Sequence, residues 1–100
     1  MSEPKVYTQL ITFPGIPIET ITNAVGLLMN VHGVQHQLSV NPEGFSSDAL
    51  QTGDEVADIR ATNQYLELNG LLGGLSRDHE LVTCDTKSDG KCLHLTLTCK

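Results

Sequence analysis

The sequence predicts an α+β domain built as a split βαβ (ferredoxin-like) sandwich, with one mainly antiparallel sheet and two helices on one face. Three observations lead to this expectation. A strand-like start runs into an amphipathic helix, alternating segments form two hairpin-like pairs, and a second helical segment lies between the pairs. The order is therefore βαββαβ plus an extra C-terminal strand. A chain of 100 residues is expected to form a single domain over residues 1–100.

The first strand is expected over residues 4–13, where β-branched and aromatic residues dominate, and Pro14-Gly15 should end it. A helix should begin near Pro17, whose φ already suits a first helical turn. Its buried face is marked by residues that recur every three or four positions: Ile18, Ile21, Val25, Leu28 and His32. Gly33 is expected to end this helix in a left-handed conformation.

A hairpin is expected next. Residues 34–40 alternate, with Val34, His36, Leu38 and Val40 on one face and polar residues on the other. Asn41–Gly44 carries the residues of a tight turn, so residues 45–50 should return as a shorter strand.

The second helix is the element for which an alternative stays open. Thr52 and Glu55 suggest a capping box, and an apolar series follows: Val56, Ile59, Ala61, Leu66, Leu68, Leu72 and Leu75. Because Gly70, Gly73 and Gly74 would each cost about 1 kcal/mol inside a helix, we expect this helix to end or kink near Asn69. The alternative is a strand over residues 64–70 that enters an Asn69-Gly70 turn.

The last quarter predicts a hairpin in which residues 80–86 and 92–99 flank an Asp89-Gly90 turn. Pairing around that turn sets Cys84 opposite Leu95 and Val82 opposite Leu97 on an apolar face. It also sets Asp85 opposite His94 on the outer face. That pair resembles half of a catalytic triad, but a cross-strand polar pair on an exposed sheet is the favoured interpretation.

Charge and composition narrow the function classes. The formal net charge is −6 and the basic residues are scattered singly, which disfavours direct binding of nucleic acid or of an anionic membrane. A basic protein partner suits this charge. The start of the chain lacks a basic-then-apolar leader, so we expect a cytoplasmic protein whose three cysteines are reduced thiols.

The residues that carry chemistry do not form a recognisable site in the sequence. The cysteines lack a Cys-x-x-Cys spacing, and the predicted register separates Cys84, Cys92 and Cys99, so neither a metal nor a cofactor is expected. His36 shares a face with Val34 and Leu38, which is typical of a partly buried histidine. The glycines of Gly70–Gly74 lack the Lys-Ser/Thr of a phosphate loop.

Parts of the chain resemble three known families. Residues 9–40, with Gly33-Val34 at the second strand, resemble the first unit of heavy-metal-associated domains, but Pro17–Thr20 replace their Cys-x-x-Cys. The order helix, hairpin, long helix, hairpin over residues 18–98 resembles the Roadblock family of small regulatory dimers. The Asp89-Gly90 hairpin is similar to that of a winged helix. None of the three resemblances includes a diagnostic motif.

The sequence therefore predicts a non-enzymatic regulatory or protein–protein interaction module, a homodimer that also suits a basic protein partner as an acidic inhibitor or adaptor. The last strand is long, uncharged and free of proline, so we expect it to be an exposed edge that pairs with a partner. Its expected interaction residues are Leu93, His94, Leu95, Thr96 and Leu97. The alternative is a small enzyme or ligand-binding domain with a pocket near Gly70–Gly74, His36 and Cys84.

Overall fold

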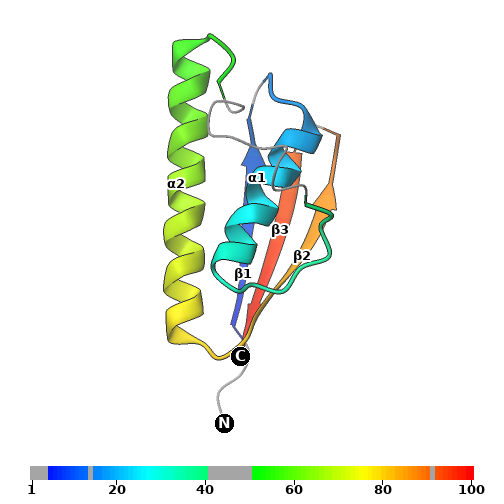
Figure 1. Ribbon diagram of the computed structural model, residues 1–100, viewed down its shortest axis with the longest axis vertical. Helices are drawn as coiled ribbons and strands as arrows, with labels where there is room; N and C mark the ends of the chain where they lie inside the picture. The colour runs from blue at the N-terminus through cyan, green and yellow to red at the C-terminus, as the bar shows by residue number, and fades with distance from the viewer. Residues whose placement is uncertain (1–4, 14, 41–50, 91) are drawn as a thin grey trace.

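The computed structural model describes residues 5–13, 15–40, 51–90 and 92–100. Their order is β1 (Lys5–Thr12), α1 (Ile18–Val31), α2 (Glu55–Asp78), β2 (Val82–Ser88) and β3 (Cys92–Cys99) (Figure 1). The described part is an α+β fold with a three-stranded antiparallel sheet and two helices. The predicted α+β class is confirmed at this level, whereas the full βαββαβ layout with an extra strand is not.

The sheet has the order β1-β3-β2, so the last strand lies in the centre and pairs antiparallel with both neighbours. β1 is joined to β3 from Lys5, opposite Cys99, to Thr12, opposite Cys92. This pairing places the first and the last strand side by side (Figure 1). The prediction that the last strand is a sheet edge is therefore wrong.

Residues 34–40 are not a regular strand, which corrects a second prediction. They touch the sheet through one isolated parallel bridge between Gln35 and Thr83. The Gln35 N–H donates to the Val82 carbonyl at 3.0 Å, and the Cys84 N–H donates to the Gln35 carbonyl at 2.8 Å. Burial still alternates as predicted, because Val34 is buried while Gln35 and Gln37 are exposed. The expected turn 41–44 and strand 45–50 lie outside the described residues.

α1 forms as predicted. Pro17 is its N-cap residue, and Gly33 follows the helix with a φ of 72°, in the left-handed region that glycine adopts without strain. Gly26 is buried in the middle of α1, where a Cβ atom would collide with the Cγ2 methyl of Val40. The segment after the helix thus folds back closely over it.

α2 is longer than the sequence indicated: it passes through Gly70, Gly73 and Gly74 and ends at Asp78. Its N-cap is Asp54, whose carboxylate accepts the Val56 and Ala57 N–H groups, rather than the predicted Thr52. The buried residues of the helix continue on both sides of the glycines: Ala61, Leu68, Leu72 and Leu75. Tertiary packing of this face therefore outweighs the cost of the glycines, as is common for amphipathic helices.

The final hairpin forms, but its register differs from the prediction by two residues. Val82 lies opposite Cys99, and Cys84 lies opposite Leu97. The Asp89 N–H donates to the Cys92 carbonyl at 2.9 Å, so the turn comes one residue later than Asp89-Gly90. A shift of two residues keeps every side chain on its predicted face, because the strand period is two.

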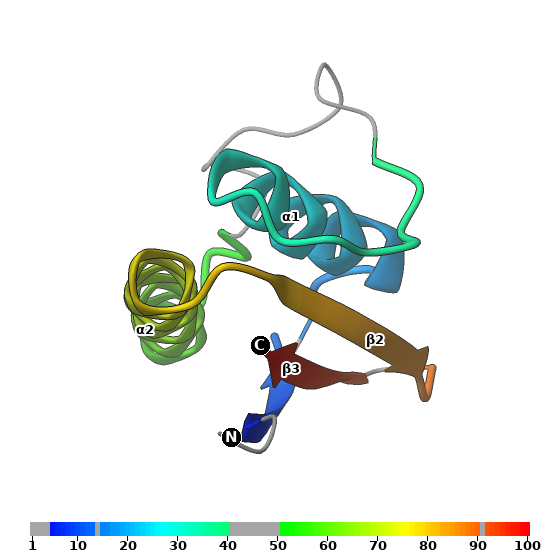
Figure 2. The same ribbon diagram turned by 90° about the horizontal axis from the view of Figure 1, so that it is seen from below.

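Both helices cover the same face of the sheet (Figure 2). The core between them is aliphatic, and its fully buried side chains come from both helices and the central strand: Ile21, Met29, Leu72, Leu93, Leu95, Leu97, Val25 and Cys99. Among the described residues no polar or charged residue is buried. No helix in the described ranges is both long enough and apolar enough to cross a membrane.

Candidate interaction surface

The predicted interaction residues of β3 separate into two groups. Leu93, Leu95 and Leu97 lie in the core, with at most 1% of each exposed. His94 and Thr96 point to the opposite face, where His94 lies across from Leu10 and Lys87. Because strands occupy both sides of β3, these residues offer no free strand edge to a partner.

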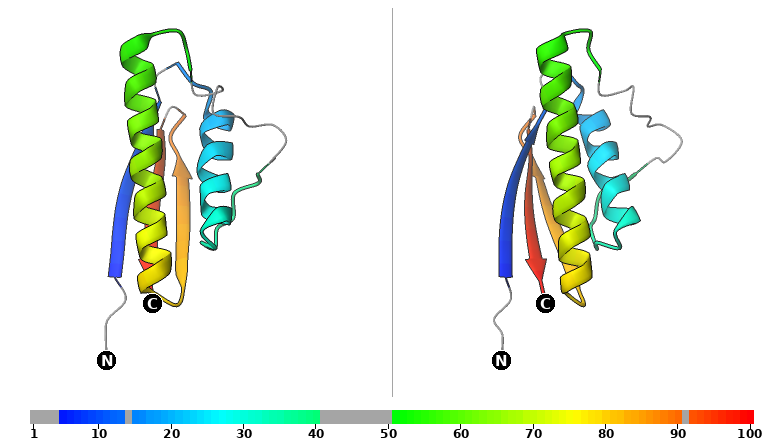
Figure 3. Two further views of the ribbon diagram at one scale, coloured as in Figure 1. Left: turned by 60° about the vertical axis from the view of Figure 1, so that its left-hand side comes forward. Right: turned by 90° about the vertical axis from the view of Figure 1, so that its left-hand side faces the viewer.

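Among the described residues, β1 is the outermost strand with no further strand beside it (Figure 3), whereas β2 meets Gln35 through one bridge. At one end of the outer edge of β1, the Thr12 N–H donates to Gln64 Oε1 of α2 at 3.2 Å. Successive residues of a strand send their backbone groups to alternate sides, so Val6, Thr8 and Leu10 direct theirs to the same edge as Thr12. An uncovered edge of this kind is a template for pairing with another chain.

The sheet face turned away from the helices carries Val6 and Leu10, which are both exposed, beside a set of threonines. Cross-strand neighbours on this face are Thr8 with Thr96, Val6 with Thr98, and Thr98 with Thr83. Asp85 lies opposite Thr96 rather than His94, so the predicted Asp–His pair is wrong. The face is a mixed polar and apolar surface with no nucleophile–base pair among these partners.

A second exposed apolar surface lies on α2. Val56, Ile59 and Leu66 are 61%, 54% and 58% exposed. At 100° per residue they fall within one narrow sector of the helix, on the side opposite Leu68 and Leu72. We call the residues of this sector the outer stripe: Val56, Ile59, Asn63, Leu66, Gly70, Gly74 and Arg77.

Sequence reasoning missed the outer stripe, because it assigned every apolar residue of this helix to one series. The signal that separates them is present in the sequence. Val56, Ile59 and Leu66 are spaced by three and seven residues, whereas Ala61, Leu68, Leu72 and Leu75 follow a second series on the other side. A helix with two apolar faces has one for the core and one for another contact.

Comparison of the chain with protein-family models, with curated proteins and with solved structures found no match.

The alternative pocket is not assembled in the described residues. Both ring nitrogens of His36 are engaged locally: Nε2 hydrogen-bonds to Asn30 Oδ1 at 2.7 Å, and Nδ1 accepts the Leu38 N–H at 3.1 Å. Gly73 lies beside His32 rather than His36. The hollows at the start of α2, on the open sheet face and beside Phe13 are lined by other residues.

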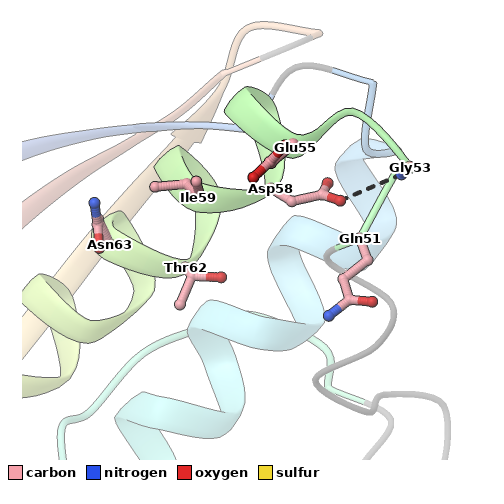
Figure 4. Close-up of a pocket in the computed structure, with 7 residues that line it drawn as sticks. All are labelled: Gln51, Gly53, Glu55, Asp58, Ile59, Thr62 and Asn63. Carbon is pink, nitrogen blue, oxygen red and sulfur yellow. Dashed lines mark hydrogen bonds between the residues drawn. The ribbon is translucent and has the colours of Figure 1, made fainter.

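The hollow at the start of α2 is shallow and lies between the helix and the loop before it (Figure 4). Two carboxylates line it, Glu55 and Asp58, and Asp58 accepts hydrogen bonds from the Thr52 N–H at 2.7 Å and the Gly53 N–H at 3.3 Å. These bonds hold the pKa of Asp58 below its ordinary value. The carboxylate thus fastens its own loop, and within the described residues no group of three His, Cys, Asp or Glu side chains could hold a metal ion.

The three cysteines are free thiols, and Cys84 and Cys99 are buried. Burial, and to a smaller extent the charge of Asp85, raises the pKa of the Cys84 thiol to about 12. Burial raises the pKa of Cys99 as well. A reactive thiolate needs the opposite shift, so Cys84 does not have the character that the alternative function requires.

The raised pKa of Cys84 predicts how stability changes at alkaline pH. A thiol that ionises later in the folded than in the unfolded chain stabilises the fold fully below about pH 8.5. Between about pH 8.5 and pH 12, the thiol is ionised in the unfolded chain but protonated in the folded chain. The free energy of unfolding therefore falls by about 1.4 kcal/mol per pH unit in this range. Urea denaturation at several pH values, for the wild type and Cys84→Ala, should show a shallower decline in the variant. Parallel curves would contradict the prediction.

Proposed function

We propose that the protein is a non-enzymatic protein–protein interaction module that acts as a homodimer. The observation that carries the proposal is the distribution of exposed apolar side chains. Five of them lie on two surfaces, Val6 and Leu10 on β1 and Val56, Ile59 and Leu66 on α2. Single exposed apolar residues are ordinary, but aligned ones indicate a surface that a partner covers.

Two further features support this function over catalysis. The histidine and thiol that the sequence offered for a pocket are engaged or buried, as His36 bonds to Asn30 and to the Leu38 N–H and Cys84 has a raised pKa. The charge supports a regulatory partner of opposite sign. Each chain has a formal net charge of −6, so a dimer would present an acidic surface to a basic protein.

The test is the mass of the purified chain in solution, measured by size-exclusion chromatography with light scattering at low and high salt. We expect twice the 10.8 kDa mass of one chain at both salt concentrations, because apolar contacts are not screened by ions. A monomer under both conditions, up to the highest soluble concentration, would rule out the homodimer. Dimers that dissociate at high salt would indicate association through charge and would contradict an apolar interface.

A further inference from the structure

The outer stripe has the spacing of a helix–helix seam. Its positions 56, 59, 63, 66, 70, 74 and 77 follow one another at steps of three or four residues across almost the whole of α2. This is the heptad spacing that keeps one side of a helix against a second helix. α1 packs on the core side of α2 (Figure 2), so among the described residues no second helix lies against the stripe.

Two glycines of the stripe have no explanation within their own chain. A Cβ atom at Gly70 or at Gly74 would meet no heavy atom within 4 Å, whereas one at Gly73 would meet the His32 ring at 3.3 Å. Glycine weakens a helix interior compared with alanine. A second helix that approaches the backbone closely at these positions would account for both residues.

We propose that two copies of the chain associate through their outer stripes, with the α2 helices antiparallel and Leu66 near the two-fold axis. This inference rests on the proposed homodimer and names its interface. In that arrangement Ile59, seven residues before Leu66, lies near Gly74 of the second copy, eight residues after its own Leu66. The bulky half of each stripe fills the space above the glycine half of the other, as an isologous interface requires.

Charge favours the antiparallel orientation. Glu55 and Arg77 lie eleven residues before and eleven residues after Leu66, at the two ends of the stripe. Both are exposed, and neither has an ion-pair partner in the described part of the chain. An antiparallel pair places Glu55 of one copy beside Arg77 of the other at both ends. A parallel pair would bring like charges together at both ends, which is unfavourable.

The decisive variant is Leu66→Glu, which would place two carboxylates at the centre of the apolar seam. Leu66 is exposed in the single chain, so the fold should keep its circular dichroism spectrum. We expect the dimer dissociation constant to rise about 100-fold or more. The matched controls are Val31→Glu on α1 and Val6→Glu on β1, both also exposed, and both should remain dimeric.

The outcomes separate this inference from the proposed function. A dimer that persists in Leu66→Glu but is lost in Val6→Glu would move the interface to the sheet; the homodimer would stand and the α2 interface would be overturned. A wild-type monomer would overturn both.

Gly70→Ala and Gly74→Ala give a test in which the two effects have opposite signs. In the monomeric Leu66→Glu background each should raise the melting temperature by about 4 °C, because alanine stabilises an open helical position. In the otherwise wild-type chain each should weaken the dimer about 10-fold, because a methyl group separates the helices. An unchanged dimer dissociation constant would contradict close packing at these glycines.

Orientation is tested by cross-linking with a short bis-maleimide in a Cys92→Ser background, which removes the most accessible thiol. Leu66→Cys places two thiols together near the axis, so we expect covalent dimers. Ile59→Cys is the matched control, because the two thiols would then be fourteen residues apart along the pair, about 21 Å at the helical rise. Cross-linking at both positions would show a parallel pair, and cross-linking at neither would exclude the stripe as the interface.

Discussion

Replacing Leu97 with alanine is expected to lower the free energy of unfolding by about 3 kcal/mol. Leu97 has no exposed surface, and it lies in the central strand between Tyr7 of β1 and Cys84 of β2. Both strands and the covering helices are held in place around it, so the cavity left by the missing atoms cannot collapse easily. A loss of this size is a large fraction of the stability of a small domain.

The measurement is urea denaturation followed by circular dichroism, with Leu10→Ala as the matched control. Leu10 is also a leucine of the sheet, but it lies on the uncovered face and is 51% exposed. Its replacement should cost less than about 1 kcal/mol, as for other surface positions. Equal losses for the two variants would contradict the placement of β3 at the centre of the sheet.

What could be predicted from the sequence is the part that depends on local periodicity. β1, α1 and the faces of the final hairpin follow from spacings of two or of three and four residues. The face assignments of Val82, Cys84, Leu95 and Leu97 survived a register error, because that error was an even number of residues. The turn residues Asp89 and Gly90 are compatible with a turn that begins at either residue. The sequence therefore did not identify the register of the hairpin.

What could not be predicted depends on partners that are distant in the sequence. The pairing of β1 with β3 joins residues 80 to 94 positions apart, and no local pattern identifies the partner of a strand. It is this pairing that turns the expected edge strand into the central one, while the helices bury Leu93 and Leu95 on the covered face. The interaction residues predicted on β3 were therefore misplaced, although the apolar alternation behind them was correct.

The length of α2 also depends on contacts that are distant in the sequence. Helix propensity indicated an end near Asn69, since three glycines follow it closely. Leu72 and Leu75 beyond that point are buried against the core, and this non-local contact carries the helix to Asp78. Local preference is a weak guide where tertiary packing supplies the stability.

Replacing Gly26 with alanine is expected to destabilise the protein by about 1–2 kcal/mol, although alanine is favoured over glycine in a helix by about 1 kcal/mol. The added methyl group would overlap the Cγ2 methyl of Val40 and would also lie 3.7 Å from the Leu38 Cβ. Valine is restricted at χ1, so its methyl groups cannot easily turn away. The clash therefore exceeds the gain in helix propensity.

A double-mutant cycle with Val40→Ala tests whether a clash with Val40 causes the destabilisation by Gly26→Ala. Truncating Val40 alone should cost about 1 kcal/mol of apolar contact, but it frees the space that the Gly26→Ala methyl needs. Urea denaturation of all four proteins should therefore show the double variant more stable than the sum of the single losses, by about 1 kcal/mol. If Gly26→Ala instead stabilises the protein, Val40 does not lie against α1. The cycle thus measures whether residues 34–40, which have the alternation of a strand but only one bridge to the sheet, are held by packing on α1.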